Sequence, residues 1–117
     1  MLDWVSRLFQ AIDRMDPDSF AEFLAEDGIF KFGNAQPVKG KRNVRDAVAA
    51  FFSSIKGIGH KLLGTWQVGD VVFVQGEVTY TRKDDRVVTV PFFNIFKMNG
   101  CSVSEYIIYV DVSPLYA

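Results

Sequence analysis

The spacing of apolar residues in this chain changes once, near Gly57. Before that residue, apolar side chains recur every three or four positions, which is the spacing of amphipathic helices. After it, they alternate or run together in β-branched and aromatic blocks, which is the pattern of strands. Helices followed by a run of strands predict an α+β domain in which helices cover one face of a sheet. The 117 residues are enough for one such unit, so residues 1–117 are assigned to a single domain.

Three helices are expected in the first half of the chain. The first covers residues 2–14, where the apolar side chains form one stripe. The second begins at Asp16, a good N-cap followed by proline, and covers residues 16–28. A short strand is expected over residues 29–32, and the third helix over residues 43–54.

Four strands are expected after the change in spacing, over residues 58–68, 71–82, 86–98 and 103–112. The sequences Gly-Asp, Lys-Asp-Asp and Asn-Gly separate them, and such short turns join antiparallel neighbours. Three short helices cover only one face of this sheet, which leaves an apolar patch on the other. We expect a second copy of the chain to cover that patch, because two-fold dimers are the commonest assembly.

Short turns also predict which side chains share a face of the sheet, because side chains alternate along a strand. The face that we assign to the helices carries His60, Leu62, Trp66, Phe73, Gln75, Glu77, Phe92, Asn94, Phe96, Glu105, Ile107, Tyr109 and Asp111. The opposite face is almost wholly apolar and is assigned to the dimer. The face assigned to the helices mixes polar with aromatic side chains. Buried polar groups without partners are costly, so this face is expected to border a pocket that holds water or ligand. A bulge in any strand would shift these faces.

Composition excludes several classes of protein. A single Cys rules out an internal disulfide and a cysteine-built zinc site, and a single His argues against a His-rich metal site. A net charge of −1 does not indicate the excess of basic side chains with which proteins bind nucleic acid. No apolar run reaches the roughly 18 residues that span a membrane, and the charged N-terminal segment is not a secretory signal. We therefore expect a cytoplasmic protein with neither a nucleic-acid nor a membrane partner.

Two segments, FKFGN at residues 30–34 and YVDVSPLY at residues 109–116, together with the hairpin strands, resemble the SnoaL-like branch of the nuclear transport factor 2-like superfamily. The resemblance covers essentially the whole chain. It implies a cone-shaped α+β fold in which three N-terminal helices pack on a strongly curved, mainly antiparallel sheet and enclose a pocket, commonly in a homodimer. The superfamily includes polyketide cyclases, ketosteroid isomerases, epoxide hydrolases, dehydratases and proteins without chemistry, so the fold alone does not give the reaction.

The resemblance also implies site residues. In the cyclases and epoxide hydrolases, a carboxylate at the position of Asp111 projects into the pocket as a general acid or base. The epoxide hydrolases have an Arg and an Asp where this chain has Gln75 and Glu77, and a Tyr and an Asn where it has Phe32 and Asn34. The absent Arg and the absent Tyr hydroxyl argue against epoxide hydrolysis by that mechanism.

Four residues are candidates for catalysis: Asp111, Glu77, His60 and Tyr109. An apolar pocket would raise the pKa of Asp111 and suit it to proton transfer; alternatively, its side chain caps the end of the last strand. Glu77 and His60 would form an acid/base couple, or a structural polar pair. Tyr109 would donate a hydrogen bond to an oxyanion, or serve as an aromatic wall residue.

Aromatic residues make up 15% of the chain and are assigned to cavity lining or to core. The substrate-binding candidates are Asn34, Phe32, Gln75, Asn94, Trp66, Phe73, Phe92 and Phe96. These residues imply no metal and no organic cofactor. The sequence thus predicts an isomerase, cyclase or dehydratase that acts on an apolar cyclic, polyketide- or steroid-like molecule through carboxylate acid/base chemistry. The alternative is a dimeric protein without catalysis that binds an apolar ligand or serves as an accessory protein.

Overall fold

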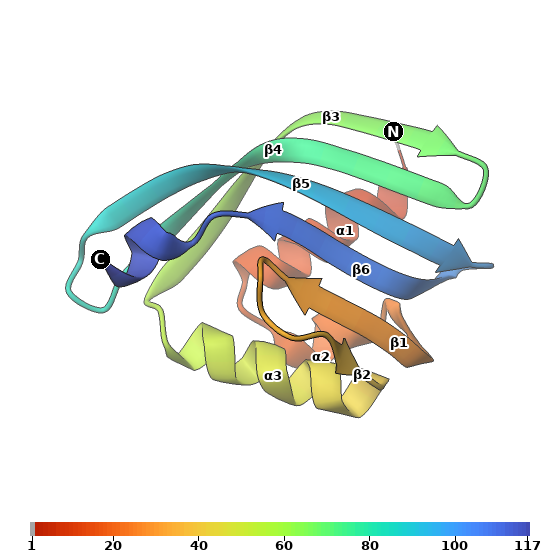
Figure 1. Ribbon diagram of the computed structural model, residues 1–117, viewed down its shortest axis with the longest axis horizontal. Coiled ribbons are helices and arrows are strands. Elements are labelled where there is room, and N and C mark those ends of the chain that lie inside the picture. The colour runs from red at the N-terminus through yellow and green to blue at the C-terminus, as the bar shows by residue number, and fades with distance from the viewer. Residues whose placement is uncertain (1) are drawn as a thin grey trace.

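The computed structural model describes residues 2–117, which form three helices packed on one curved sheet. The elements in chain order are α1 (Asp3–Asp13), α2 (Pro17–Ala21), β1 (Leu24–Phe32), β2 (Val38–Lys39), α3 (Lys41–Ser53), β3 (Gly57–Val68), β4 (Val71–Thr81), β5 (Val87–Asn99), β6 (Ser102–Val110) and the 3-10 turn η1 (Ser113–Tyr116). Figure 1 shows all three helices on the concave side of the sheet. The predicted α+β class and layer arrangement are confirmed. No helix within residues 2–117 is long and apolar enough to cross a membrane.

The six strands lie in the order β2-β1-β6-β5-β4-β3. The strands β3 to β6 form the expected antiparallel meander, whereas β1 runs parallel to β6 and makes the sheet mixed. The second helix is shorter than expected, because it ends at Ala21 and β1 already begins at Leu24. Leu24 pairs with Val103 of β6, so a partner distant in the sequence converts the end of the expected helix into strand.

The expected register of the first hairpin holds only near its turn. As far as Gly64 opposite Gln75, the β3–β4 pairs agree with the expectation. A bulge between Leu62 and Gly64 then shifts the pairing by one residue, so His60 lies opposite Val78 and not opposite the following threonine. The bulge was not predicted, and it reverses the faces of β3 relative to β4.

The registers of the other two hairpins also differ from the expectation. The loop between β4 and β5 covers residues 82–86, so Glu77 lies opposite Pro91. The last turn and a bulge near Met98 place Asn94 opposite Ile108. Because a shift of one residue moves every side chain of a strand to the other face, the predicted faces of β4 and β6 are wrong.

The concave face, toward the helices, therefore has a different composition from the one predicted. It carries Ile58, His60, Val72, Val74, Val78, Tyr80, Phe92, Asn94, Phe96, Tyr106, Ile108 and Val110. The convex face carries Trp66, Phe73, Gln75, Glu77, Phe93, Ile95, Glu105, Ile107 and Tyr109. The helices thus cover the mainly apolar set, and the mixed set faces outward.

The core fills the space between the concave face and the helices. The side chains of Val5, Leu8 and Phe9 from α1 are buried against it, as are those of Val44 and Phe52 from α3. These residues belong to the apolar faces of their helices, so local amphipathicity explains which side of each helix is buried.

Candidate functional site

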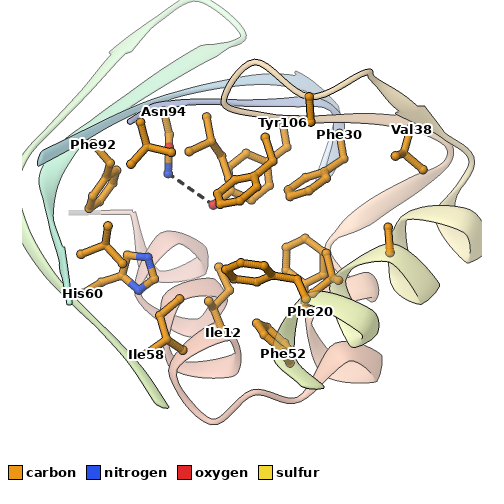
Figure 2. A pocket seen from close by; sticks show the side chains of 18 of the residues that line it. Ile12, Phe20, Phe30, Val38, Phe52, Ile58, His60, Phe92, Asn94 and Tyr106 are labelled. Carbon is orange, nitrogen blue, oxygen red and sulfur yellow. Dashed lines mark hydrogen bonds between the residues drawn. The ribbon is translucent and has the colours of Figure 1, made fainter. Parts of the chain in front are cut away.

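A cavity of about 200 Å³ lies between the helices and the concave face of the sheet. Most of its wall is apolar, and the aromatic side chains that line it are Phe20, Phe30, Phe32, Phe51, Phe52, Tyr80, Phe92 and Tyr106. Figure 2 shows these walls facing each other, with Phe30 and Tyr106 on the sheet side and Phe20 and Phe52 on the helix side. Ligand sites for small molecules are commonly apolar enclosures of this kind with a few polar groups.

The aromatic wall is held by contacts between rings. The Phe30 ring packs edge-to-face against Tyr106 at 5.4 Å and against Phe20 at 5.9 Å. Phe32 of β1 packs against Phe51 of α3, with 5.1 Å between ring centroids. Edge-to-face and tilted ring pairs stabilise one relative orientation, so the shape of the wall is defined by its own packing.

His60 and Asp13 form the polar pair of the site. Asp13 is the last residue of α1, and its Oδ1 lies 2.6 Å from Nδ1 of His60. The backbone N–H of His60 also donates to Oδ2 of Asp13 at 3.3 Å. The imidazole packs between Phe9 at 4.9 Å and Phe92 at 5.3 Å, and its side chain is only 10% exposed. The carboxylate therefore fixes the position of a histidine that borders the cavity.

The contact with Asp13 also selects the tautomer of His60. A carboxylate only accepts hydrogen bonds, so in the neutral imidazole the proton is on Nδ1 and the lone pair is on Nε2. Nε2 makes no hydrogen bond to any of residues 2–117. A histidine held in this way by a carboxylate is suited to general acid/base chemistry on a molecule in the cavity.

Asn94 of β5 and Tyr106 of β6 form a second polar pair on the cavity wall. Nδ2 of Asn94 donates to the Tyr106 hydroxyl oxygen at 3.3 Å, and both side chains are almost fully buried. Burial, with a smaller effect from Tyr80, raises the pKa of Tyr106 far above its ordinary value. Burial likewise raises the pKa of Tyr80. Both phenols are therefore neutral hydrogen-bonding groups at physiological pH.

The structure brings four of the predicted site residues to the cavity wall: His60, Asn94, Phe32 and Phe92. Phe96 lies deeper in the core, where its ring packs 4.3 Å from that of Tyr106. Asn34 is exposed in the turn that follows β1.

Five predicted site residues face away from the cavity, because a bulge or a shifted register exchanges the faces of their strands. They are Glu77, Gln75, Trp66, Phe73 and Tyr109 on the convex face. The expected couple of Glu77 and His60 does not form, and the carboxylate partner of His60 is Asp13.

Asp111 is exposed just after the end of β6 and does not line the cavity. Its Oδ1 accepts hydrogen bonds from the hydroxyl of Ser113 at 2.7 Å and from the backbone N–H of Ser113 at 3.0 Å. These bonds lower the pKa of Asp111, so the expected rise in its pKa is wrong. The alternative interpretation, a cap at the end of the last strand, describes its contacts.

The sequence interpretation missed Asp13, Tyr80 and Tyr106. Asp13 follows Phe9 by four residues, which places both on one side of the first helix, and this spacing was the available signal. Because of the incorrect registers, the two tyrosines were not included in the face assigned to the helices. Among residues 2–117 there is no cluster of three or more His, Cys, Asp or Glu side chains that could hold a metal ion.

Residues 5–106 match the family model described as "SnoaL-like domain". The chain belongs to the SnoaL-like family. This confirms the resemblance inferred from the sequence. No protein with a curated description matches this SnoaL-like chain.

Solved structures share the fold of this SnoaL-like domain. A hypothetical protein with a ketosteroid isomerase-like protein fold from Catenulispora acidiphila DSM 44928, in complex with trimethylamine, has a TM-score of 0.86 at 16% identity, over 93% of this chain and 85% of that one. A SnoaL-like polyketide cyclase from Jannaschia sp. CCS1 has a TM-score of 0.83 at 21% identity, over 96% and 85%. An LEH-like epoxide hydrolase from M. tuberculosis has a TM-score of 0.81 at 15% identity, over 96% and 83%. At these identities the likeness is one of fold.

Proposed function

We propose that this SnoaL-like domain binds an apolar, polyketide- or steroid-like cyclic molecule and isomerises, cyclises or dehydrates it, with His60 as general acid/base. The observation that supports this most strongly is the 2.6 Å contact between His60 Nδ1 and Asp13 Oδ1 at the wall of an aromatic cavity. Each of these reactions includes a proton transfer, and a positioned imidazole near neutral pH performs that step well.

In this proposal the carboxylate that matters is Asp13 and not Asp111. Asp13 acts as a positioning residue, because it holds the imidazole and stabilises its protonated form when the proton is taken up. The chemical class of the substrate is supported by the apolar wall and by the name of the Jannaschia structure, a polyketide cyclase.

A test with a defined probe is the base-promoted ring opening of 5-nitrobenzisoxazole. In this reaction a base removes the ring C–H proton, the N–O bond breaks, and its electron pair leaves on the phenolate oxygen. We expect the wild-type protein to accelerate the reaction, His60→Gln to abolish the acceleration, and Asp13→Asn to reduce it. Asp111→Asn is the matched control, because its carboxylate lies outside the cavity, and should behave as wild type.

Equal rates for wild type and His60→Gln would refute the role of His60. Tight binding of the probe without any acceleration would favour the alternative, an apolar-ligand carrier without catalysis. Mass spectrometry of small molecules that survive native purification provides an independent test of the ligand class. It should detect an apolar cyclic compound, and a polar or highly charged ligand would contradict the proposal.

We also propose that the protein is a homodimer through the convex face of the sheet. Trp66 is 51% exposed and Tyr109 is 56% exposed, and the exposed Phe93 ring stacks on Phe73 at 5.9 Å. Opposite charges occur together on the same face, as in the ion pair between Lys97 and Glu105. A two-fold interface must be complementary to itself, and an apolar patch with both signs of charge meets that condition.

Sedimentation velocity tests this interface. We expect the wild-type protein to sediment as a dimer and Trp66→Glu to sediment as a folded monomer. Tyr116→Glu is the control, because Tyr116 is at least as exposed as Trp66 but lies in η1, outside the sheet. A monomeric wild type, or a Trp66→Glu dimer, would contradict the proposal.

A further inference from the structure

The amide of Asn94 has one end without a partner. Its side chain is 1% exposed and borders the cavity, and Nδ2 is engaged with the Tyr106 hydroxyl. Oδ1 is buried and has no hydrogen-bond partner among residues 2–117. Figure 2 shows this amide projecting from the sheet beside the bond to Tyr106. A buried acceptor without a donor destabilises the folded chain, so this position is unfavourable for folding alone.

The surroundings of Oδ1 indicate the kind of donor that it fits. The lining residues include no Lys, Arg, Asp or Glu, so a charged ligand group would enter without an opposite charge on the wall. The remaining surface is mainly aromatic and aliphatic. A ring that carries a neutral hydroxyl satisfies both conditions, because the ring contacts the apolar wall and the O–H donates to the amide oxygen.

The amide and the imidazole occupy neighbouring parts of the wall. Phe92 precedes Asn94 by two residues on β5 and so shares its face, and the Phe92 ring lies 5.3 Å from that of His60. A ligand hydroxyl bound to Asn94 therefore places the attached ring next to the candidate base.

We propose that Asn94 is the specificity-determining residue of the cavity and that its Oδ1 accepts a hydrogen bond from a hydroxyl on the ring of the ligand. This inference rests on the proposed function, because it concerns the same cavity. It narrows the ligand class from apolar cyclic molecules in general to those with a ring hydroxyl, and it excludes hydrocarbons and ethers of the same shape.

Three probes of one ring system test the inference: 2-naphthol, 2-methylnaphthalene and 2-methoxynaphthalene. The methyl group matches the hydroxyl in size, and the methoxy group accepts hydrogen bonds but cannot donate one. An apolar cavity of about 150 Å³ accepts benzene, and this cavity is larger. Calorimetric titration should show that 2-naphthol binds about tenfold or more tightly than the other two, since a donor is gained by a buried acceptor.

Two variants separate recognition from packing. Asn94→Leu should bind all three probes with similar affinity, because it removes the acceptor oxygen. Its thermal midpoint is measured to confirm that the variant is folded, since the change also removes the partner of the buried Tyr106 hydroxyl. Phe92→Leu also changes the wall but has no hydrogen-bonding group, so it should weaken all three probes and keep the preference for 2-naphthol. The comparison is needed because a change that acts only through the packing of the cavity should weaken the binding of all three probes together.

The outcomes distinguish this inference from the proposed function. Equal binding of the three probes to wild type would overturn the role of Asn94 and leave the apolar cavity supported. A preference for 2-methoxynaphthalene would mean that Nδ2 faces the ligand, which also overturns the inference. If no probe binds, the proposed ligand class itself fails. A preference for 2-naphthol that persists in Asn94→Leu would assign the recognition to another residue.

Discussion

Gly76 connects the curvature of the sheet to the shape of the site. It lies on β4 opposite Leu62, at the bulge of β3. A Cβ atom at this position would lie 2.2 Å from the carbonyl oxygen of Lys61 and 2.9 Å from Cε2 of Phe92. A side chain at residue 76 would therefore prevent the close approach of the two strands. It would also displace the Phe92 ring, which is part of the cavity wall. We therefore predict that Gly76→Ala destabilises the protein.

The size of the effect follows from two opposing contributions. Adding a methyl group to a packed interior costs about 1–3 kcal/mol, and the upper half of that range applies because the obstructing atom belongs to the backbone of a paired strand. Replacing glycine by alanine also reduces the freedom of the unfolded chain, which contributes about 0.4–1 kcal/mol in the other direction. The expected net loss is about 2 kcal/mol, or a decrease of about 8 °C in the thermal midpoint of a domain of this size.

Thermal unfolding followed by circular dichroism measures this loss. Gly59→Ala is the matched control, because Gly59 is also in the β3–β4 hairpin and no heavy atom lies within 4 Å of its added Cβ. The control should equal or slightly exceed the stability of wild type. Gly76→Ala should in addition weaken the binding of 2-naphthol, because it displaces Phe92 and the strand segment that carries His60. A Gly76→Ala midpoint as high as that of Gly59→Ala would refute the steric reasoning.

Three further predictions concern capping, the core and alkaline pH. Asp16→Ala should lower the thermal midpoint, and the difference from wild type should vanish as the pH falls below about 3.8, because hydrogen bonds from Ser19 lower the pKa of Asp16 and are lost on protonation. Phe20→Ala should cost about 3–5 kcal/mol in urea unfolding, since Phe20 is fully buried. Stability should decrease as the pH rises above about 10, because burial raises the pKa of Tyr80 and Tyr106 only in the folded state. Tyr106→Phe should reduce that decrease in urea titrations.

The existence and order of the elements could be predicted because they depend on local signals. The bounds of the strand pair β3 (Gly57–Val68) and β4 (Val71–Thr81) lie within one residue of those expected from the turn sequence and the apolar blocks. The helix α3 (Lys41–Ser53) was likewise expected from its apolar spacing to within two residues. By contrast, β1 begins five residues earlier than predicted, because its first residue pairs with β6 near the other end of the chain.

The positions of site residues depended on register, which local signals do not determine. Asn94 and His60 were expected on the face toward the helices, and both lie there. Glu77 and Tyr109 were expected beside them but face outward, because the loop before β5 is longer than two residues and the last hairpin is shifted. A change of one residue in a turn or bulge exchanges the two faces of a strand, so such errors affect whole sets of side chains.

The sequence of this protein therefore established its α+β class, its family and the scarcity of groups that could carry chemistry, because these follow from spacing, motifs and composition. The pairing of His60 with Asp13 could be known only from the folded chain, since these residues are 47 positions apart and meet where the first helix ends against β3. The unpartnered oxygen of Asn94 is likewise a property of packing, because it depends on which hydrogen-bond donors the surrounding strands and helices place beside it. Local sequence determines which elements form, and the contacts between distant elements determine which side chains reach the cavity.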